Sequence, residues 1–427
     1  MSAPTRTSNR PDSQAKTRLV RSVDALERLF YRYAERNPAH FCQVAEFDVT
    51  FTEKQVRTAL SAIQRRHPLL SVHVEDRPSS RLGFYRTDSV APIDLTVHES
   101  SRPWQSFATA ELAHPFDRST APLMRAVLVN HRAGSTILLT FDHTIADGIS
   151  SITVLSDLVD ALNGKISAPR DVPAPLEDIV AQTLSCADTP RSDASCDPRM
   201  AEPRSIRPFD GTHPEIHTVA LDTADTARLV DRCRAERTTV HAALIAAASR
   251  AHATLSDKEF VRVLSPINVR PMIGAVGDCV DYFTCTVTGM TPWDGTALWE
   301  QARAMTGELA IARSEAGVAA TSSMIKQAVN VDAECAVPEQ LFTQIMPFEL
   351  MISNLGVQDL DAFGPIKPTA LWGPVLQSQV DDHVIGVTTY DGRLRMVSTG
   401  YTPSDVYLET VKAALIQAAA QPRNSPS

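Results

Sequence analysis

The residues whose types and spacing could carry out chemistry are concentrated in one heptapeptide, residues 142–148 (DHTIADG). Its histidine, His143, is followed four residues later by Asp147 and Gly148. A neutral imidazole titrates near pH 6.5 and can take a proton from a hydroxyl group at neutral pH. His143 is therefore a candidate general base. The alternative interpretation is structural, namely an Asp-Gly turn beside a half-buried histidine.

The flanking segments predict how this histidine is positioned. Residues 135–141 (STILLTF) form a nearly continuous apolar run, which is typical of a strand buried on both faces. Residues 149–162 carry apolar side chains at helical spacing. A histidine at a strand end is held by rigid backbone, and the free N–H groups of Gly148 and Ile149 at a helix start favour developing negative charge. A base beside an anion site is what acyl transfer needs.

Apolar periodicity and turn residues predict further elements along the chain. We expect helices at 23–37, 52–67, 149–162, 224–236, 239–255, 296–313 and 406–420. We expect strands at 43–50, 69–74, 121–129, 135–141, 218–221, 261–267, 282–287, 350–353, 384–390 and 394–400. Strands and helices alternate irregularly in both halves, which predicts an α/β layered sandwich rather than a repeating barrel.

Length and composition predict two domains. A chain of 427 residues is too long for one compact core. Apart from Leu176 to Leu184, apolar periodicity fades between Gly164 and about Pro214, where Pro and Ser accumulate, so this stretch is interpreted as a linker or crossover. The predicted organisation is a disordered tail at 1–18, a domain with the candidate base at 19–163, the linker at 164–214, a second domain at 215–420, and a disordered tail at 421–427.

Charge and hydropathy exclude several classes of function. The net charge of −9 argues against a nucleic-acid partner, which requires clustered positive charge. No run of 18 apolar residues is present, so no membrane span is expected. The polar N-terminus lacks the apolar stretch of a secretory signal; a transit peptide is the weaker alternative to a disordered tail. A cytoplasmic protein that acts on small molecules is the expectation.

The seven cysteines and the remaining histidines predict neither a disulfide framework nor a metal site. No Cys-x-x-Cys pair occurs and the number of cysteines is odd, so a reducing compartment fits. Some of these cysteines could be reactive, but burial is the more frequent fate. The histidines outside the heptapeptide lack metal-ligand spacing. No Gly-rich phosphate loop precedes a helix, which argues against a nucleotide-dependent enzyme.

The stretch DHTIADGIS resembles the signature of the CoA-dependent acyltransferase superfamily. This group includes chloramphenicol acetyltransferases, plant BAHD acyltransferases, condensation domains of peptide synthetases, and polyketide-associated acyltransferases. Four further stretches resemble family segments in the family's order: residues 65–70 (RRHPLL), 115–125 (PFDRSTAPLMR), 265–278 (SPINVRPMIGAVGD) and 353–356 (SNLG). Together they span roughly residues 20 to 410, and their joint order is more specific than any one of them.

The resemblance implies two chloramphenicol-acetyltransferase-like domains with a tunnel at their interface. His143 would lie in the middle of this tunnel as the general base, and the donor and acceptor would enter from opposite ends. Asp147 would pair with Arg270 and hold the loop in shape rather than take part in proton chemistry. Donors near Gly148, together with Asn354, would stabilise the oxyanion. No metal and no tightly bound cofactor are implied, because the acyl-CoA or acyl-carrier thioester is a substrate.

This chain departs from the family pattern at two places, which narrows the branch of the superfamily that it resembles. Many members have a second histidine where this chain has Asp142, which either orients a neighbouring group or is simply a solvated or structural carboxylate. The Asp-Phe-Gly-Trp-Gly motif of BAHD enzymes is absent, and residues 371–374 (LWGP) resemble it only weakly. The pattern therefore favours the polyketide-associated or alcohol acetyltransferase branch.

Three functions remain open at this stage. The first is an O-acyltransferase that moves an acyl group from acyl-CoA or an acyl carrier protein to a hydroxyl of a secondary-metabolite, polyketide or lipid-type acceptor. The second is an amide-forming condensation enzyme, against which the lack of an adjoining carrier or adenylation region counts. The third is a non-catalytic member that binds a carrier protein or metabolite. A monomer is expected, because two linked domains can build a complete tunnel.

Overall fold

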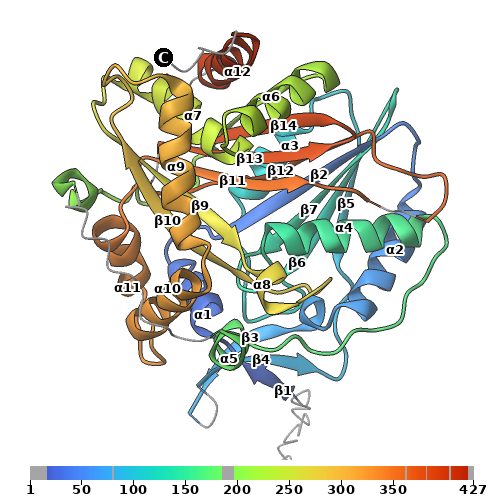
Figure 1. Cartoon of the computed structure of the whole chain (residues 1–427). Helices are drawn as coiled ribbons and strands as arrows, with labels where there is room; N and C mark the ends of the chain where they lie inside the picture. The colour runs from blue at the N-terminus through green and yellow to red at the C-terminus, as the bar shows by residue number, and fades with distance from the viewer. Residues whose placement is uncertain are drawn as a thin grey trace, which may run out of the picture.

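Among the residues described by the structure, a computed structural model, the strands form three sheets (Figure 1). The described residues are 17–78, 81–184, 197–360, 363–380, 382–402 and 405–421. Two larger sheets carry the two halves of the chain, and a small sheet packs beside the first of them. The architecture is a layered α/β fold, as the alternation of strands and helices predicts.

The five-stranded sheet holds the strand that leads to His143. Its order is β12-β2-β7-β6-β5, and its central strand β7 is completely buried. In sheet order the strands are β12 (Ala370–Leu376), β2 (His40–Phe47), β7 (Gly134–Asp142), β6 (Met124–His131) and β5 (Asp94–Glu99). Because β12 comes from late in the chain and pairs antiparallel with β2, the second half completes the sheet of the first.

The six-stranded sheet belongs entirely to the second half, in the order β10-β9-β11-β13-β14-β8. These strands are β10 (Phe283–Met290), β9 (Val261–Asn268), β11 (Leu350–Val357), β13 (His383–Tyr390), β14 (Arg393–Gly400) and β8 (Glu215–Ala220). The small third sheet has the order β1-β4-β3 and contains β1 (Thr17–Ser22), β4 (Arg81–Thr87) and β3 (His73–Arg77).

Helices cover these sheets. The first half contains α1 (Ala25–Tyr33), α2 (Glu53–Arg66), α3 (Gln105–Leu112), α4 (Gly148–Leu162) and, in the connecting segment, α5 (Leu176–Thr183). The second half contains α6 (Thr223–Ala235), α7 (Val240–Ser256), α8 (Arg270–Ile273), α9 (Leu298–Ala312), α10 (Glu315–Ala328), α11 (Ala336–Gln340) and α12 (Asp405–Ala420). In Figure 1, α7, α9 and α12 gather at one end of the molecule, and α4 runs along the sheet that contains β2 and β7.

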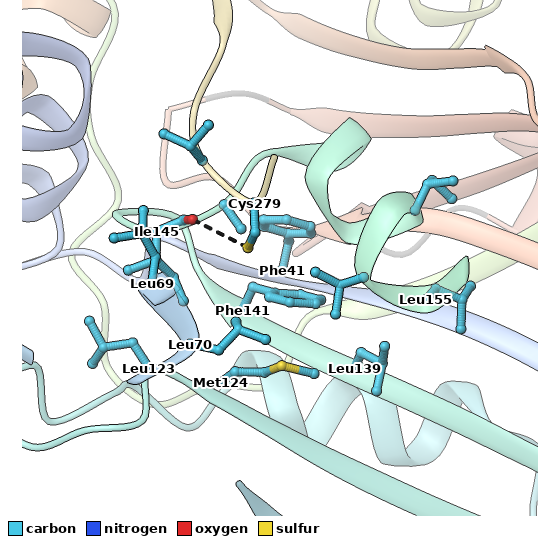
Figure 2. Close-up of a cluster of buried hydrophobic side chains, with 14 of the residues drawn as sticks. Phe41, Leu69, Leu70, Leu123, Met124, Leu139, Phe141, Ile145, Leu155 and Cys279 are labelled. Atoms are coloured by element: carbon cyan, nitrogen blue, oxygen red, sulfur yellow. Dashed lines mark hydrogen bonds between the residues drawn. The ribbon is translucent and has the colours of Figure 1, made fainter. Parts of the chain in front are cut away.

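A hydrophobic core lies directly beneath the candidate loop and joins the two halves. Phe41 and Phe141 from neighbouring strands pack there against Ile145 and Leu155 (Figure 2). Cys279 comes from the second half and lies against these side chains, with its Sγ 3.7 Å from the carbonyl oxygen of Ile145. The backbone after β7 is therefore packed from both sides, which limits the motion of His143.

The predicted helices are all present, with ends shifted by a few residues, but one predicted strand is wrong. Residues 69–74 form a 3-10 helix (Pro68–Ser71) that passes into β3. Pro68 starts this turn, and a tight turn lets Leu69, Leu70 and Ser71 all be buried, which mimics the apolar pattern of a strand. Strand β2 also begins and ends three residues earlier than the predicted 43–50.

Other elements were not predicted, notably β1, β4, β5, α3, α10, α11 and β12. The predicted linker contains α5 and a second 3-10 helix (Pro198–Ala201). The predicted disordered tails lie outside the described residues except for Thr17, Arg18 and Gln421, and the first two of these begin β1. The domain boundaries themselves stay a prediction, and the pairing of β12 with β2 shows that the second half contributes a strand to the sheet of the first.

Candidate active site

His143 lies at the end of the buried strand β7, as the sequence predicts. The strand ends at Asp142, and the backbone N–H of His143 donates to the carbonyl oxygen of Ala39 at 2.8 Å. Helix α4 begins five residues after His143, at Gly148, with Asp147 as its N-cap. The histidine is thus fixed between a central strand and a helix start.

Three aromatic rings hold the imidazole of His143. The ring of Phe30 on α1 stacks on it with centroids 3.9 Å apart and planes 6° from parallel. Phe41 on β2 and Phe283 on β10 flank it at 5.1 and 5.7 Å. Only 15% of the His143 side chain is exposed. The ring is therefore held by residues from both halves of the chain while one edge remains accessible.

A buried carboxylate faces one nitrogen of this ring. Oδ1 of Asp281 lies 3.4 Å from Nδ1 of His143, and the Asp281 side chain has no exposed surface. Burial raises the pKa of Asp281 to about 7. Burial alone would lower the pKa of His143, but the Asp281 carboxylate, with smaller contributions from Asp147 and from the backbone of His143, raises it overall. Sequence reasoning missed Asp281, since a single carboxylate in a loop has no diagnostic spacing from a distant histidine.

Asp147 and Arg270 form the ion pair that the family resemblance implies. Nη1 of Arg270 lies 2.7 Å from Oδ2 of Asp147, and both side chains are buried. Asp147 also accepts hydrogen bonds from the backbone N–H and the hydroxyl of Ser150 and from the N–H of Tyr282. Burial by itself would raise the pKa of Asp147, but the Arg270 guanidinium and these hydrogen bonds hold it below its usual range.

The same network clamps the backbone on both sides of Asp281. Val280 donates its N–H to the hydroxyl of Ser150 at 3.0 Å, and its carbonyl accepts from Nη2 of Arg270 at 2.8 Å. On the other side, the N–H of Tyr282 bonds to Asp147 at 2.9 Å. Thus the residues around the active-site helix start fix the loop that carries Asp281.

Two adjoining cavities meet at His143. The larger, of about 170 Å³, is lined mainly by apolar side chains such as Leu26, Leu29 and Phe342, and also by Gly148 and Asn354. A smaller cavity, of about 50 Å³, shares His143 with the first and extends toward Ala39 and Ser378. The predicted base and both predicted oxyanion residues are therefore brought to one apolar space.

The start of helix α4 lines this cavity with Gly148 and Ile149. The first N–H groups of a helix have no partner within the helix, and those of Gly148 and Ile149 belong to this class. A Cβ at Gly148 would lie 2.6 Å from Cδ2 of Leu355, so glycine keeps this approach open. Asn354 uses Oδ1 to accept from the N–H of Gly356 at 2.9 Å, which orients its amide.

Asp142 has a structural position. Its Oδ1 accepts the N–H of Thr144 at 2.9 Å, and its side chain is buried, so it is not a solvated carboxylate. Within the described ranges, no group of three or more His, Cys, Asp or Glu side chains could hold a metal ion. No helix in the described part of the chain is long and apolar enough to cross a bilayer.

Sequence comparisons find one family model and one curated protein that are similar to part of the chain. Residues 28–172 match the condensation domain family. Phosphinothricin tripeptide synthetase PhsC of Streptomyces viridochromogenes is 33% identical over 119 residues. That match covers 26% of this chain and only 11% of the synthetase, so it concerns a small part of a much longer protein.

Structural comparisons extend the likeness over almost the whole chain. Polyketide synthase associated protein 5 of Mycobacterium tuberculosis superposes with a TM-score of 0.69 at 14% identity, covering 94% of this chain and 98% of that chain. The trichothecene 15-O-acetyltransferase TRI3 of Fusarium sporotrichioides gives 0.65 at 12% identity, covering 94% and 95%. The first condensation domain of the CDA synthetase gives 0.64 at 13% identity, covering 94% and 96%. The chain has the two-lobed fold that these proteins share.

Proposed function

We propose that this chain, a relative of condensation domains through residues 28–172 and through its fold, transfers an acyl group from a thioester to a hydroxyl group. The observation that carries this proposal is the position of His143. Its ring is held by aromatic side chains at an apolar cavity that also contains the free N–H groups at the start of α4. A base and an anion site at one enclosed space are the requirements for acyl transfer.

In the proposed reaction, His143 takes the proton of the acceptor hydroxyl at Nε2, the nitrogen on the ring edge away from Asp281. The oxygen then attacks the thioester carbonyl carbon, and the carbonyl oxygen becomes an oxyanion. When this intermediate collapses, the carbon–sulfur bond breaks and the departing thiolate takes the proton from His143. No acyl group is attached to the protein at any step.

The oxyanion would be stabilised by donors at the cavity wall. The N–H groups of Gly148 and Ile149 lie at the positive end of the α4 dipole, and the amide of Asn354 lines the same space. Loss of a single donor of this kind typically costs about a hundredfold to a thousandfold in kcat. A dry, apolar lining strengthens these interactions and keeps water from the thioester.

The donor and acceptor are named only by class. The donor is acyl-CoA or an acyl group on a carrier protein, and the acceptor is an alcohol of the secondary-metabolite, polyketide or lipid type. The fold of TRI3, described as a 15-O-acetyltransferase, supports an ester product. The match to the condensation domain family supports the second candidate, an amide-forming enzyme with the same base.

A substrate panel distinguishes these functions. Purified protein is mixed with acetyl-CoA, longer acyl-CoAs and acylated carrier protein, each with a set of alcohols and amines, and released thiol is measured. Thiol release that requires an alcohol supports the proposal, and release that requires an amine supports the amide-forming alternative. Binding of donor or carrier without release under any combination would point to a non-catalytic protein.

A further inference from the structure

Asp281 is unusual among the buried carboxylates of the described residues because neither oxygen has a hydrogen-bond donor. Asp147 and Glu349 are also buried, but the former accepts four hydrogen bonds (from Ser150, Arg270 and Tyr282) and the latter three (all from Arg262). Leaving a buried charged group without donors is expensive. Such a group calls for a functional explanation.

The neighbouring charges leave His143 as the natural partner of Asp281. Among ionisable groups, those that act most strongly on the Asp281 carboxylate are His143, Asp147 from the N-terminus of α4, and Glu27 from α1. Asp147 is already balanced by Arg270, and Glu27 by Arg21. Cys279 on the same loop stays a neutral thiol, because burial raises its pKa far above neutrality.

We propose that Asp281 is a positioning residue that accepts the Nδ1–H of His143, so that Nε2 is the basic nitrogen facing the cavity. This inference rests on the proposed function of His143. When His143 takes the acceptor proton at Nε2, the imidazolium forms 3.4 Å from the Asp281 carboxylate, which counters its charge. The proton on Nδ1 stays there throughout, and Asp281 does not touch the substrate.

The clamped loop explains how this arrangement is maintained. The residues on either side of Asp281 are tied to Ser150, Asp147 and Arg270. The separation of 3.4 Å exceeds the 2.7–2.9 Å that is usual for a charge-assisted hydrogen bond. Catalytic hydrogen bonds are often long without substrate and shorten as charge develops. Under this inference, the Asp147–Arg270 pair acts on His143 through the position of Asp281.

The test compares Asp281→Asn with Asp278→Asn, its control on the same loop. Asp278 is partly exposed, and its Oδ1 lies 4.0 Å from Nη1 of Arg170. We expect D281N to lower kcat at least tenfold, with the KM of both substrates within about twofold. Removal of the carboxylate lowers the pKa of His143, so the acidic limb of the kcat/KM profile moves to lower pH. D278N should leave both kcat and the acidic limb of the kcat/KM profile unchanged.

A second measurement uses the wild-type protein and does not depend on the variant folding. Nitrogen NMR of ¹⁵N-histidine-labelled protein reports which ring nitrogen of each histidine carries the proton, and His143→Gln assigns the signal. We expect His143 to be the Nδ1–H tautomer at high pH, and D281N to lose this preference. An Nε2–H tautomer in the wild type would overturn the proposal.

The outcomes separate this inference from the function on which it rests. If His143→Ala abolishes activity but D281N matches D278N in kcat and pH profile, Asp281 is not a positioning residue while His143 keeps its role. If His143→Ala remains fully active, the proposed function fails whatever Asp281 does. Circular dichroism and thermal melting of each variant show whether a lost activity reflects lost folding.

Discussion

At the scale of single residues, different side chains fix the position of the His143 ring and stabilise its protonated form. Phe30 stacks on His143 and fixes the plane of its ring. Both carboxylate oxygens of Asp147 accept hydrogen bonds, from Ser150, Arg270 and Tyr282, so the Asp147–Arg270 pair shapes the loop. Asp281 places a carboxylate oxygen 3.4 Å from Nδ1 of the ring. These roles predict different effects when each residue is replaced.

His143→Ala should lower kcat by at least a hundredfold, because it removes the only base positioned at the cavity in the described structure. The variant should remain folded, since the surrounding aromatic rings keep their own core contacts. Steady-state thiol release checks the activity, and circular dichroism checks the fold. His114, an exposed histidine, serves as the control, and His114→Ala should match the wild type. A His143→Ala variant that keeps more than a tenth of the activity would remove His143 from its role.

Asp147→Ala and Arg270→Ala should each reduce both stability and activity. Removing one partner of a buried ion pair leaves the other charge uncompensated, which costs about 3–5 kcal/mol. Urea unfolding measures this loss. The control is Arg57→Ala, which breaks the exposed pair with Glu53 and should cost no more than about 1 kcal/mol.

A double variant and the pH dependence of stability test the Asp147–Arg270 pair more specifically. The double variant should lose less stability than the sum of the single variants, because the two residues interact; strictly additive losses would contradict the pairing. The pKa of Asp147 is depressed in the folded protein, so its contribution is present above the unfolded-state pKa near 3.8 and is lost as pH falls through the folded value. The stability gap between the wild type and Asp147→Ala should therefore shrink in acid.

At the scale of elements, β12 connects the two halves. It pairs with β2 in the first sheet and also packs against β13 of the second. The approach is close because β13 carries a glycine at the contact: a Cβ at Gly386 would lie 1.9 Å from the carbonyl oxygen of Pro374. Strand β2 in turn pairs with β7, which leads to His143.

Gly386→Ala should therefore destabilise the protein by roughly 1–3 kcal/mol, the usual range for overpacking, because backbone atoms cannot move aside easily. The control is Gly307→Ala in α9, where a Cβ would meet nothing within 4 Å. That change should raise stability by about 0.5–1 kcal/mol through helix propensity. Chemical denaturation of both variants checks the prediction, and equal effects at the two sites would show that the contact at Pro374 is not tight.

At the scale of the whole molecule, the cavity at His143 is built by both halves. Phe30, Phe41 and Gly148 come from the first half, and Phe283, Asn354 and Leu376 from the second. A second cavity, also lined by His143, adjoins the first. This arrangement suits two substrates that meet at His143 while both are bound. Much of the rate would then come from holding them in line.

Kinetics should reflect such a ternary complex. Initial-rate lines should intersect when donor and acceptor are varied, and intact-mass measurement should show no stable adduct after incubation with acyl donor alone. The best candidate nucleophile at the cavity is Cys285, but burial raises its pKa to about 12, so it stays protonated at neutral pH. Cys285→Ala should accordingly remain active. A stoichiometric acyl adduct that reacts on to product when acceptor is added would exclude direct transfer.

The sequence alone determined the local features of this site. The apolar run before His143 predicts a buried strand, and the spacing after Gly148 predicts α4, because both patterns reflect local periodicity. The order of the motifs implied the fold and the pairing of Asp147 with Arg270, and the structure contains both. The catalytic roles of His143, Gly148 and Asn354 stay predictions until activity is measured.

Only the tertiary structure decided the features that depend on contacts between distant segments. Strand β12 contains Gly373 and Pro374, residue types that are uncommon inside strands, yet it forms because it completes the sheet beside β2. Asp281 looks like any loop carboxylate in the sequence, and its proximity to His143 arises from the clamp made by Ser150, Asp147 and Arg270. Local patterns record which face of an element is buried, but they do not record which distant residue covers it, because the packing of separate elements sets that choice.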